Sequence, residues 1–242
     1  MGVAYVTLDN PPANSYDLEV MQRFADDVDA AIASDARVVV VRSASEKFFS
    51  AGADVKRFLE GDVDANMEMI RTSQAVFRRM AAAEQVFIAY VAGHALGGGL
   101  EIALACDVRL AAPGTYKLGT PEVTLGLLPG NGGTQRLTRL LGPSRAMDLL
   151  LTGRTFSPDE ALAWGLVAAL VDEDGASGYA ERLAAGPRLA IAAIKRCVHE
   201  GGEQPLADGL ALEAELVEQL FRSADATEGL KAFSEKRAPT FA

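Results

Sequence analysis

Apolar and polar positions in the first part of the chain follow three different patterns. VAYVTL, residues 3–8, alternates apolar and polar side chains, which is typical of a half-buried strand. Apolar residues then recur every three to four positions over residues 18–33, which predicts an amphipathic helix. The β-branched run ARVVVVRS, residues 36–43, is typical of a fully buried strand. The chain therefore begins with a strand, a helix and a second strand.

Strands and helices continue to alternate after this start. The pattern predicts a helix over about residues 64–84 and a strand over VFIAYVAG, residues 86–93. A helix that begins with three glycines follows. Two short strands come after it, DVRLAA at 107–112 and YKLG at 116–119. Regular alternation of this kind predicts an α/β architecture.

The C-terminal part is predicted to be mainly helical. SPDE, residues 157–160, contains the N-cap, the first-turn proline and the capping-box glutamate of a helix start. One more strand, VAALVDE at 167–173, follows it. The last segments are amphipathic and are expected to form helices over 188–200, 205–222 and 226–233. We expect a mixed core over residues 1–184 and a helical region for docking or oligomerisation over residues 185–242.

Length and composition restrict the class of protein. With 242 residues and 49% hydrophobic content, the chain can bury a full core as one large domain, with or without an appendage. No charge-free apolar run is long enough for a bilayer span, and the N-terminus reads as a strand rather than a signal peptide. We therefore expect a cytoplasmic protein. A net charge of −10 opposes binding to nucleic acid or to anionic membranes.

Cysteine and histidine are scarce. Cys106 and Cys197 lie in apolar helical segments, where free thiols are expected rather than a disulfide. His94 and His199 are the only histidines, so we expect neither a metal site nor a His-centred catalytic triad.

The stretch GHALGGGLEIALACDV, residues 93–108, places a carboxylate in an apolar segment. Its adjacent glycines do not match the spacing of dinucleotide or P-loop motifs. They indicate either a tight turn that packs on a neighbouring strand, or a helix start whose N–H faces a developing negative charge. Glu101 opens the apolar run, and a buried carboxylate costs several kcal/mol unless it is paired or functional. We therefore interpret Glu101 as a candidate catalytic residue.

Two further glycine-bearing stretches are FFSAGAD, residues 48–54, and GTPEVTLGLLPGNGGTQRL, residues 119–137. Together with GHALGGGLE they resemble the crotonase superfamily, and most closely its enoyl-CoA hydratases. The resemblance runs from TLDNPPAN to AFSEKR, almost from end to end. It implies an α/β spiral of repeated ββα turns, followed by a helical region that forms homotrimers, often stacked as hexamers. The three amphipathic C-terminal segments also favour an oligomer, because their apolar faces exceed what one small tail can bury.

The resemblance also implies the chemistry. Ala53 and Gly98 match the residues whose backbone N–H groups form the oxyanion hole of the family, and Glu101 and Glu122 match the two catalytic glutamates of the hydratases. The glutamates would activate a water that attacks C3 of a 2-trans-enoyl-CoA, and Glu122 would protonate C2. The product would be a 3-hydroxyacyl-CoA, as in fatty-acid beta-oxidation. No cofactor is expected, since coenzyme A is part of the substrate. We also expect Gly98→Val to block turnover with little loss of folding.

Residues that contact the substrate are implied in the same way. Those around the two glycine-bearing turns and on the helix that follows are Ala51, Gly52, Asp54, Lys56, Gly97, Met67 and Ile70. Phe233 and Lys236 resemble residues that reach the adenine end of coenzyme A from a neighbouring subunit. By spacing alone, Met67, Ile70, Phe77 and Met80 are expected to form a core stripe.

Departures and rival functions remain open. Asn131 stands where many relatives have a small apolar residue, and we expect it to cap the next helix. PPANSYD lacks the basic residue that many relatives place near the coenzyme phosphates, which leaves Lys56 and Arg57 as local candidates. The alternatives to a hydratase are a Δ3,Δ2-enoyl-CoA isomerase, another crotonase-type acyl-CoA enzyme, or an RNA-binding or assembly subunit. Glu101 favours water chemistry, and the net charge of −10 argues against RNA.

Overall fold

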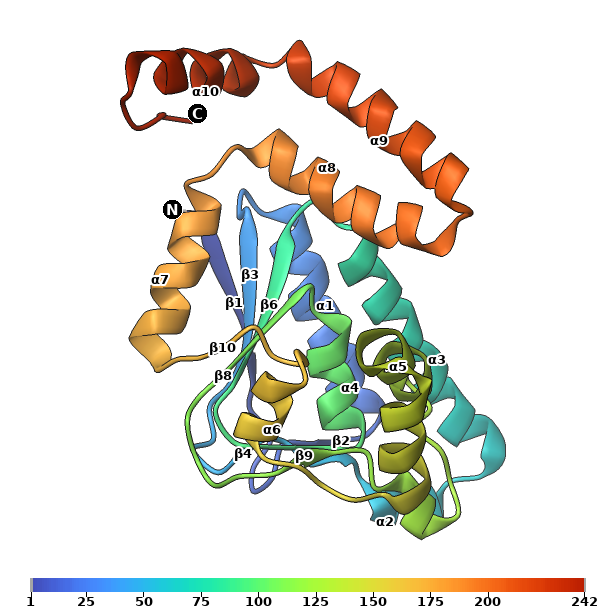
Figure 1. The fold of residues 1–242 in the computed structure, drawn as a ribbon. Coiled ribbons are helices and arrows are strands. Elements are labelled where there is room, and N and C mark those ends of the chain that lie inside the picture. Colours follow the sequence, from blue (N-terminus) through green and yellow to red (C-terminus); the bar gives the residue numbers. More distant parts are fainter. Residues whose placement is uncertain (1, 242) are drawn as a thin grey trace.

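The computed structural model describes residues 2–241, and a five-stranded parallel sheet lies at its centre (Figure 1). The strand order is β1-β3-β6-β8-β10. The bounds are Val3–Leu8 for β1, Val38–Ser43 for β3, Val86–Val91 for β6, Val108–Ala111 for β8 and Ala169–Leu170 for β10. All six residues of β6 are buried, as expected for a central parallel strand that is covered on both faces.

Two smaller parallel sheets complete the strand arrangement. One contains β4, β7 and β9, with bounds Phe48–Ser50, His94–Leu96 and Leu118–Gly119. The other pairs β2, Ser15–Tyr16, with β5, Gly52–Ala53. In chain order, β4 follows β3, β7 follows β6 and β9 follows β8, and helical segments come after each pair. This repetition is the α/β spiral of ββα turns that the family resemblance implied.

Helices surround the sheets. Those of the main body are α1 (Leu18–Ala33), α2 (Val55–Glu60), α3 (Val63–Ala82), α4 (Gly98–Ala105), α5 (Gly133–Thr152), α6 (Pro158–Ala163) and α7 (Glu173–Ala184). The C-terminal ones are α8 (Arg188–His199), α9 (Leu206–Phe221) and α10 (Ala224–Glu235). Two short 3-10 helices are η1 (Glu122–Leu125) and η2 (Gly201–Glu203). Every residue of α4 is buried, so the segment with the glycines and Glu101 forms the centre of the molecule.

Local chemistry explains where elements begin and end. The capping box at the start of α6 is confirmed: the Ser157 hydroxyl accepts the Glu160 N–H at 3.1 Å, and the Glu160 carboxylate accepts the Ser157 N–H at 2.9 Å. The strand predicted over 167–173 is shorter, Ala169–Leu170. Asp172 ends the extended segment because its side chain accepts the Gly175 N–H at 2.8 Å and caps α7.

Helix α3 buries most of the predicted stripe, but not Met67. Phe77 and Met80 are buried as expected and Ile70 is partly buried, but Met67 is 37% exposed. At about 100° per residue, Met67 and Met69 lie roughly 80° from Phe77 on opposite sides of the helix, and the buried side is that of Met69, Val76 and Met80. Met69 takes its place in the core. The prediction that Met67 belongs to the core is therefore wrong for this chain.

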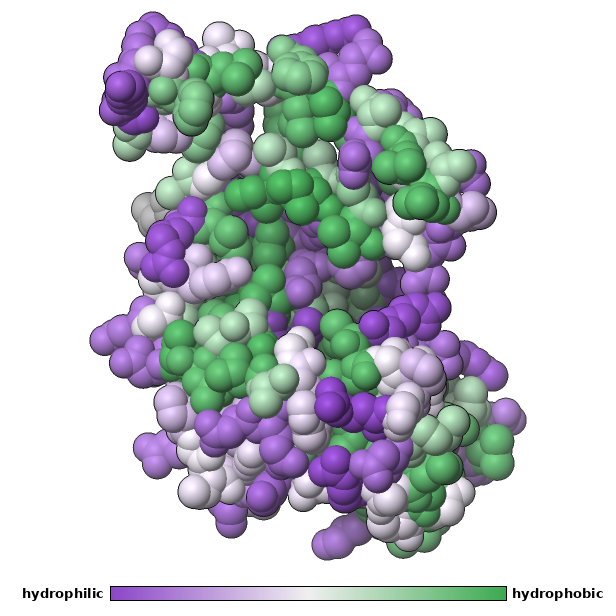
Figure 2. All heavy atoms as spheres, in the orientation of Figure 1, coloured by the Kyte–Doolittle hydropathy of each residue, from purple (hydrophilic) through white to green (hydrophobic). Residues whose placement is uncertain are grey.

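The C-terminal helices leave much of their apolar surface uncovered. Leu206 is 78% exposed, Phe221 70% and Phe233 86%. The side with these helices carries broad apolar surface over α8 and α9 (Figure 2). Within residues 2–241, no helix combines the length and apolar character that crossing a bilayer requires.

Candidate active site

Three glycines allow strands and helix α4 to meet at very short distances. Gly97 has φ +54° at the N-cap of α4, a backbone conformation that favours glycine. A Cβ atom on Gly99 would lie 2.2 Å from the Ser50 carbonyl oxygen. A Cβ atom on Gly52 would lie 2.9 Å from the Gly98 nitrogen. The turn between β4 and β5 therefore packs directly on the start of α4.

This packing brings the two residues matched to the oxyanion hole together. Ala53 follows Gly52 on β5, and Gly98 is the first residue of α4. The first N–H groups of a helix have no partner within the helix and carry its positive end. Ala53 is held from the other side, since it pairs with Tyr16 of β2. The arrangement suits a pair of backbone donors aimed at one oxygen.

Glu101 lies in the first turn of α4 and is 1% exposed. Its Oε1 accepts the N–H groups of Asn131 at 2.8 Å and Gly133 at 2.7 Å. Burial raises the pKa of Glu101, while the two N–H donors and the nearby Arg136 guanidinium oppose that rise. The carboxylate is thus buried and anchored through one oxygen.

Glu122 is the first residue of η1, directly after β9 and the Thr120-Pro121 pair. Its Oε1 lies against Gly97, where an added Cβ would be 2.9 Å away. Burial, and to a smaller extent the charge of Glu101, raise the pKa of Glu122 to about 7. The two glutamates come from segments on either side of the glycines and influence each other's protonation.

Asn131 does not cap the following helix, so that prediction is wrong. The N-cap of α5 is Gly132, whose φ is +105° and which has no side chain to form a cap. Asn131 turns inward instead, and its Nδ2 donates to the Tyr16 hydroxyl at 3.0 Å. Its backbone carries one of the N–H groups that hold Glu101. Asn131 is therefore part of the site.

Tyr16 is a site residue that the sequence reasoning missed. Its side chain is 2% exposed, and a Cβ atom on Gly98 would lie 1.7 Å from its hydroxyl oxygen. The expectation that Gly98→Val leaves folding nearly intact is therefore wrong, because a buried aromatic ring occupies that space. The only local feature that could have drawn attention to Tyr16 is its position directly before Asp17, the N-cap of α1. Its proximity to Gly98 depends on the pairing of β2 with β5.

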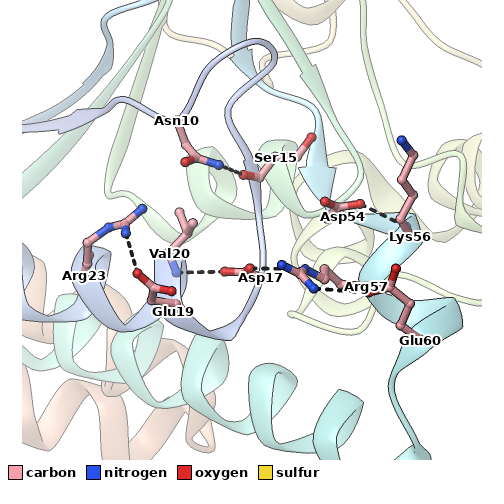
Figure 3. A network of polar contacts seen from close by, with 10 residues as sticks. All are labelled: Asn10, Ser15, Asp17, Glu19, Val20, Arg23, Asp54, Lys56, Arg57 and Glu60. Carbon is pink, nitrogen blue, oxygen red and sulfur yellow. Dashed lines mark hydrogen bonds and ion pairs between the residues drawn. The ribbon is translucent and has the colours of Figure 1, made fainter.

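The turn matched to coenzyme binding has a defined polar structure. Asp54 caps α2 by accepting the Lys56 N–H at 2.9 Å. Figure 3 shows the Arg57 guanidinium between Asp17 and Glu60, at 3.7 and 3.1 Å, whereas the Lys56 side chain extends away from them. In the described part of the chain, Lys56 has no ion-pair partner. Of these two cations, Lys56 is the one available to a phosphate.

Of the other residues matched to substrate binding, two lie next to the site and two lie far from it. Ala51 is next to Gly52, and its N–H bonds to the Ala13 carbonyl at 3.0 Å. Ile70 of α3 borders the loop before α5, where a Cβ on Gly130 would lie 3.4 Å from it. Phe233 and Lys236 lie at α10, at the opposite end of the subunit from α2 (Figure 1). They do not join the site within one chain.

Buried polar atoms without a partner concentrate at this site. In residues 2–241, three buried side-chain atoms lack a hydrogen bond: Thr120 Oγ1, Glu122 Oε2 and Asn131 Oδ1. Folded proteins satisfy nearly all such atoms, so these three are places where water or a ligand can complete the bonding. The same part of the chain holds no group of three His, Cys, Asp or Glu side chains suited to a metal ion. The expected absence of a cofactor stays a prediction.

Comparisons with known proteins agree with this geometry. Residues 1–242 match the family described as Enoyl-CoA hydratase/isomerase. The chain is 40% identical over 244 residues to a probable enoyl-CoA hydratase of Rhizobium meliloti, covering 99% of this chain and 94% of the relative. It is 36% identical to the 2,3-dehydroadipyl-CoA hydratase of Escherichia coli, with coverages of 99% and 94%.

Solved structures are similar over the same extent. The crystal structure of an enoyl-CoA hydratase from Geobacillus kaustophilus superimposes with a TM-score of 0.95 at 42% identity, covering 99% of this chain and 93% of that one. An enoyl-CoA hydratase from Bacillus anthracis has a TM-score of 0.93 at 36% identity, with coverages of 99% and 95%. The similarity thus includes the C-terminal helices as well as the spiral.

Proposed function

We propose that this chain, which belongs to the enoyl-CoA hydratase/isomerase family, is an enoyl-CoA hydratase. It adds water across the C2–C3 double bond of a 2-trans-enoyl-CoA and releases a 3-hydroxyacyl-CoA. The observation that carries this proposal is the pair of carboxyl groups beside the start of α4, the buried Glu101 and the half-buried Glu122. Water addition needs a group that takes a proton and a group that gives one.

The environments of the glutamates support one division of these roles. Two interacting carboxyl groups with raised pKa values share one proton near neutral pH. The two N–H donors on Oε1 favour the anion at Glu101, so the shared proton resides on Glu122. Glu101 takes a proton from water as the oxygen bonds to C3. The π electrons move toward the thioester oxygen, and Glu122 gives its proton to C2.

The backbone N–H groups of Ala53 and Gly98 stabilise the charge that develops on the thioester oxygen. Preorganised donors of this kind cost no reorganisation during the reaction, and each contributes on the order of 10² to 10³ in rate. Gly52, Gly97 and Asp54 shape the turn that presents them, and Ala51 continues it. Lys56 meets a coenzyme phosphate, and Met67 and Ile70 border the acyl chain. Coenzyme A enters only as part of the substrate, and no separate cofactor is required.

A panel of enoyl thioesters tests the function. The purified protein is assayed with 2-enoyl-CoA and 3-enoyl-CoA substrates of short to long chain length, and hydration is separated from double-bond migration by product analysis. We expect 2-enoyl substrates to gain water. Isomerised 3-enoyl substrates with untouched 2-enoyl substrates would contradict the proposal and identify an isomerase. An inactive protein that still binds thioesters would indicate a binding subunit.

The C-terminal helices support a homotrimer or a dimer of trimers. Their exposed apolar side chains, including Leu206 and Phe221, need a covering surface that the subunit itself does not provide. In such an assembly Phe233 and Lys236 of one subunit contact the adenine end of the coenzyme bound by its neighbour. Light scattering tests the assembly, and a monomer at micromolar concentration would contradict it. A cytoplasmic location agrees with two free thiols, Cys106 and Cys197, and is tested by cell fractionation.

A further inference from the structure

The Tyr16 hydroxyl occupies a position that connects both halves of the site. The Tyr16 backbone carbonyl accepts the Asp54 N–H at 2.8 Å, and its ring end packs on Gly98. Its hydroxyl accepts Asn131 Nδ2 at 3.0 Å, and the Asn131 N–H holds Glu101. Tyr16 therefore contacts the oxyanion turn and the loop that anchors the catalytic glutamate.

The hydrogen bond from Asn131 leaves the phenolic proton of Tyr16 without an acceptor. Among the residues that the structure describes, none accepts the Tyr16 O–H, although the side chain is 2% exposed. Burial raises the pKa of Tyr16, and the charges of Glu101 and Glu122 add to that rise, so the phenol stays protonated. The hydroxyl lies against Gly98, next to Gly97, which Glu122 Oε1 contacts, and it is bonded to Asn131, whose N–H holds Glu101. The Tyr16 O–H is thus a free hydrogen-bond donor beside the carboxylate oxygens of the site.

The attacking water needs such a donor. Water has two hydrogens and two lone pairs, and an ordered buried water makes about three hydrogen bonds. Glu101 and Glu122 can accept its two hydrogens. One lone pair must face C3, so the other requires a donor. The N–H groups of Asn131 and Gly133 are already bound to Glu101 Oε1, and the Gly97 N–H is bound to the Gly119 carbonyl.

We propose that Tyr16 is a further catalytic residue, whose hydroxyl donates a hydrogen bond to the attacking water, and that Asn131 is the positioning residue that orients this hydroxyl. This inference rests on the proposed hydratase function. Tyr16 transfers no proton. Its bond fixes the water so that the remaining lone pair points at C3, while Glu101 takes the proton and Glu122 supplies the other. Asn131 acts by occupying the phenolic oxygen, which turns the O–H toward the glutamates.

The test compares Tyr16→Phe, Asn131→Ala and the double variant with the wild-type enzyme. Tyr90→Phe is the matched control, because Tyr90 is also buried, at 8% exposure, but belongs to β6 and packs in a different cluster with α7. We measure kcat for hydration, the Kd of a saturated acyl-CoA, which needs no water, and thermal stability. Thr120→Val is included because Thr120 Oγ1 is a second unpartnered hydroxyl.

We expect Tyr16→Phe to lower kcat by about tenfold to hundredfold while the Kd of the saturated thioester changes by less than about twofold. Asn131→Ala should give a similar loss, and the double variant should be little worse than either, since both act on one water. Tyr90→Phe should hydrate normally.

Three results would overturn the inference. Normal hydration by Tyr16→Phe would do so while leaving the hydratase function intact. Parallel losses in kcat, Kd and stability would assign Tyr16 a structural role, and a loss confined to Thr120→Val would assign the donor to Thr120. A wild-type enzyme that hydrates no thioester in the panel would instead remove the proposed function, and this inference with it.

Discussion

Two regions of this molecule bury charged side chains, and they match those charges in opposite ways. In the C-terminal half of α8, Lys195 Nζ lies 2.9 Å from Asp107 and donates to the carbonyls of Met80 and Gln85 at 2.6 and 2.7 Å. His199 approaches the same aspartate at 2.7 Å, and the Phe87 N–H donates to it at 2.7 Å. At the start of α4, by contrast, two carboxyl groups lie close enough for the charge of Glu101 to raise the pKa of Glu122, and Glu122 Oε2 has no hydrogen-bond partner.

The difference separates a structural use of buried charge from a catalytic one. Burial lowers the pKa of Lys195, and Asp107 opposes that change. The contacts of Lys195 with Asp107 and with the two carbonyls attach α8 to the body. In the glutamate pair no positive charge fully offsets the effect of burial, so the pKa values of Glu101 and Glu122 are both raised. Saturated bonding holds helices together, whereas incomplete bonding leaves capacity for a ligand and a proton.

Removing a glutamate should have the largest effect, and it should act on rate. Glu122→Gln keeps the shape of the side chain but removes its transferable proton, so hydration should fall by about 10² to 10⁴. Glu101→Gln should impair hydration by a similar order. Neither change should lower thermal stability, since each removes a buried ionisable group. Steady-state kinetics and calorimetry check this. A slow Glu122→Gln beside a fully active Glu101→Gln would favour an isomerase.

Removing the lysine should act on stability instead. Lys195→Met leaves Asp107 without its main partner and frees two backbone carbonyls, so the free energy of unfolding should fall by roughly 3–5 kcal/mol. Chemical denaturation measures it, and the remaining folded enzyme should keep its kcat. Lys231→Met is the control, since its exposed pair with Glu235 is 4.0 Å long. Equal stability of the two variants would remove the contrast between the regions.

The pH dependence should sharpen the distinction. Because the pKa of Glu122 is raised to about 7, the shared proton of the glutamates is lost above that pH, and kcat/KM should fall about tenfold per further pH unit. Hydration and dehydration should show the same alkaline limb, since both start from the pair with one proton. A profile flat to pH 9 would show that Glu122 does not carry the reacting proton.

The smallest effect on stability is expected at His199, the most exposed member of the group formed by Lys195, Asp107 and His199. The His199 side chain is 38% exposed, so its bond to Asp107 is screened by solvent. His199→Gln should lower the free energy of unfolding by about 1 kcal/mol or less. A loss as large as that of Lys195→Met would mean that the histidine, rather than the lysine, holds α8 in place.

Much of the fold followed from local patterns, and the misses have physical causes. The helical spacing of residues 18–33 predicted α1, the apolar run of residues 86–93 predicted β6, which spans Val86–Val91, and the capping box predicted α6. Met67 was assigned to the core because a spacing pattern does not state which face of a helix is buried. Asn131 was assigned to a cap because its sequence context fits one. The site was found through motif resemblance, which located Glu101 and Glu122 but gave no sign of Tyr16.

The sequence by itself determined the elements whose stability is local: the alternating strand VAYVTL, the amphipathic helices, and glycines where the backbone must bend or be approached. It also determined the family, because Glu101 and Glu122 stand in extended motifs. Only the tertiary structure decided that β2 pairs with β5, which places Tyr16 on Gly98 and against Asn131. It also decided that Lys195 pairs with Asp107, which lies 88 residues earlier in the chain. Such contacts depend on how distant segments pack, whereas hydrophobic periodicity is a local pattern and does not specify which segments pack together.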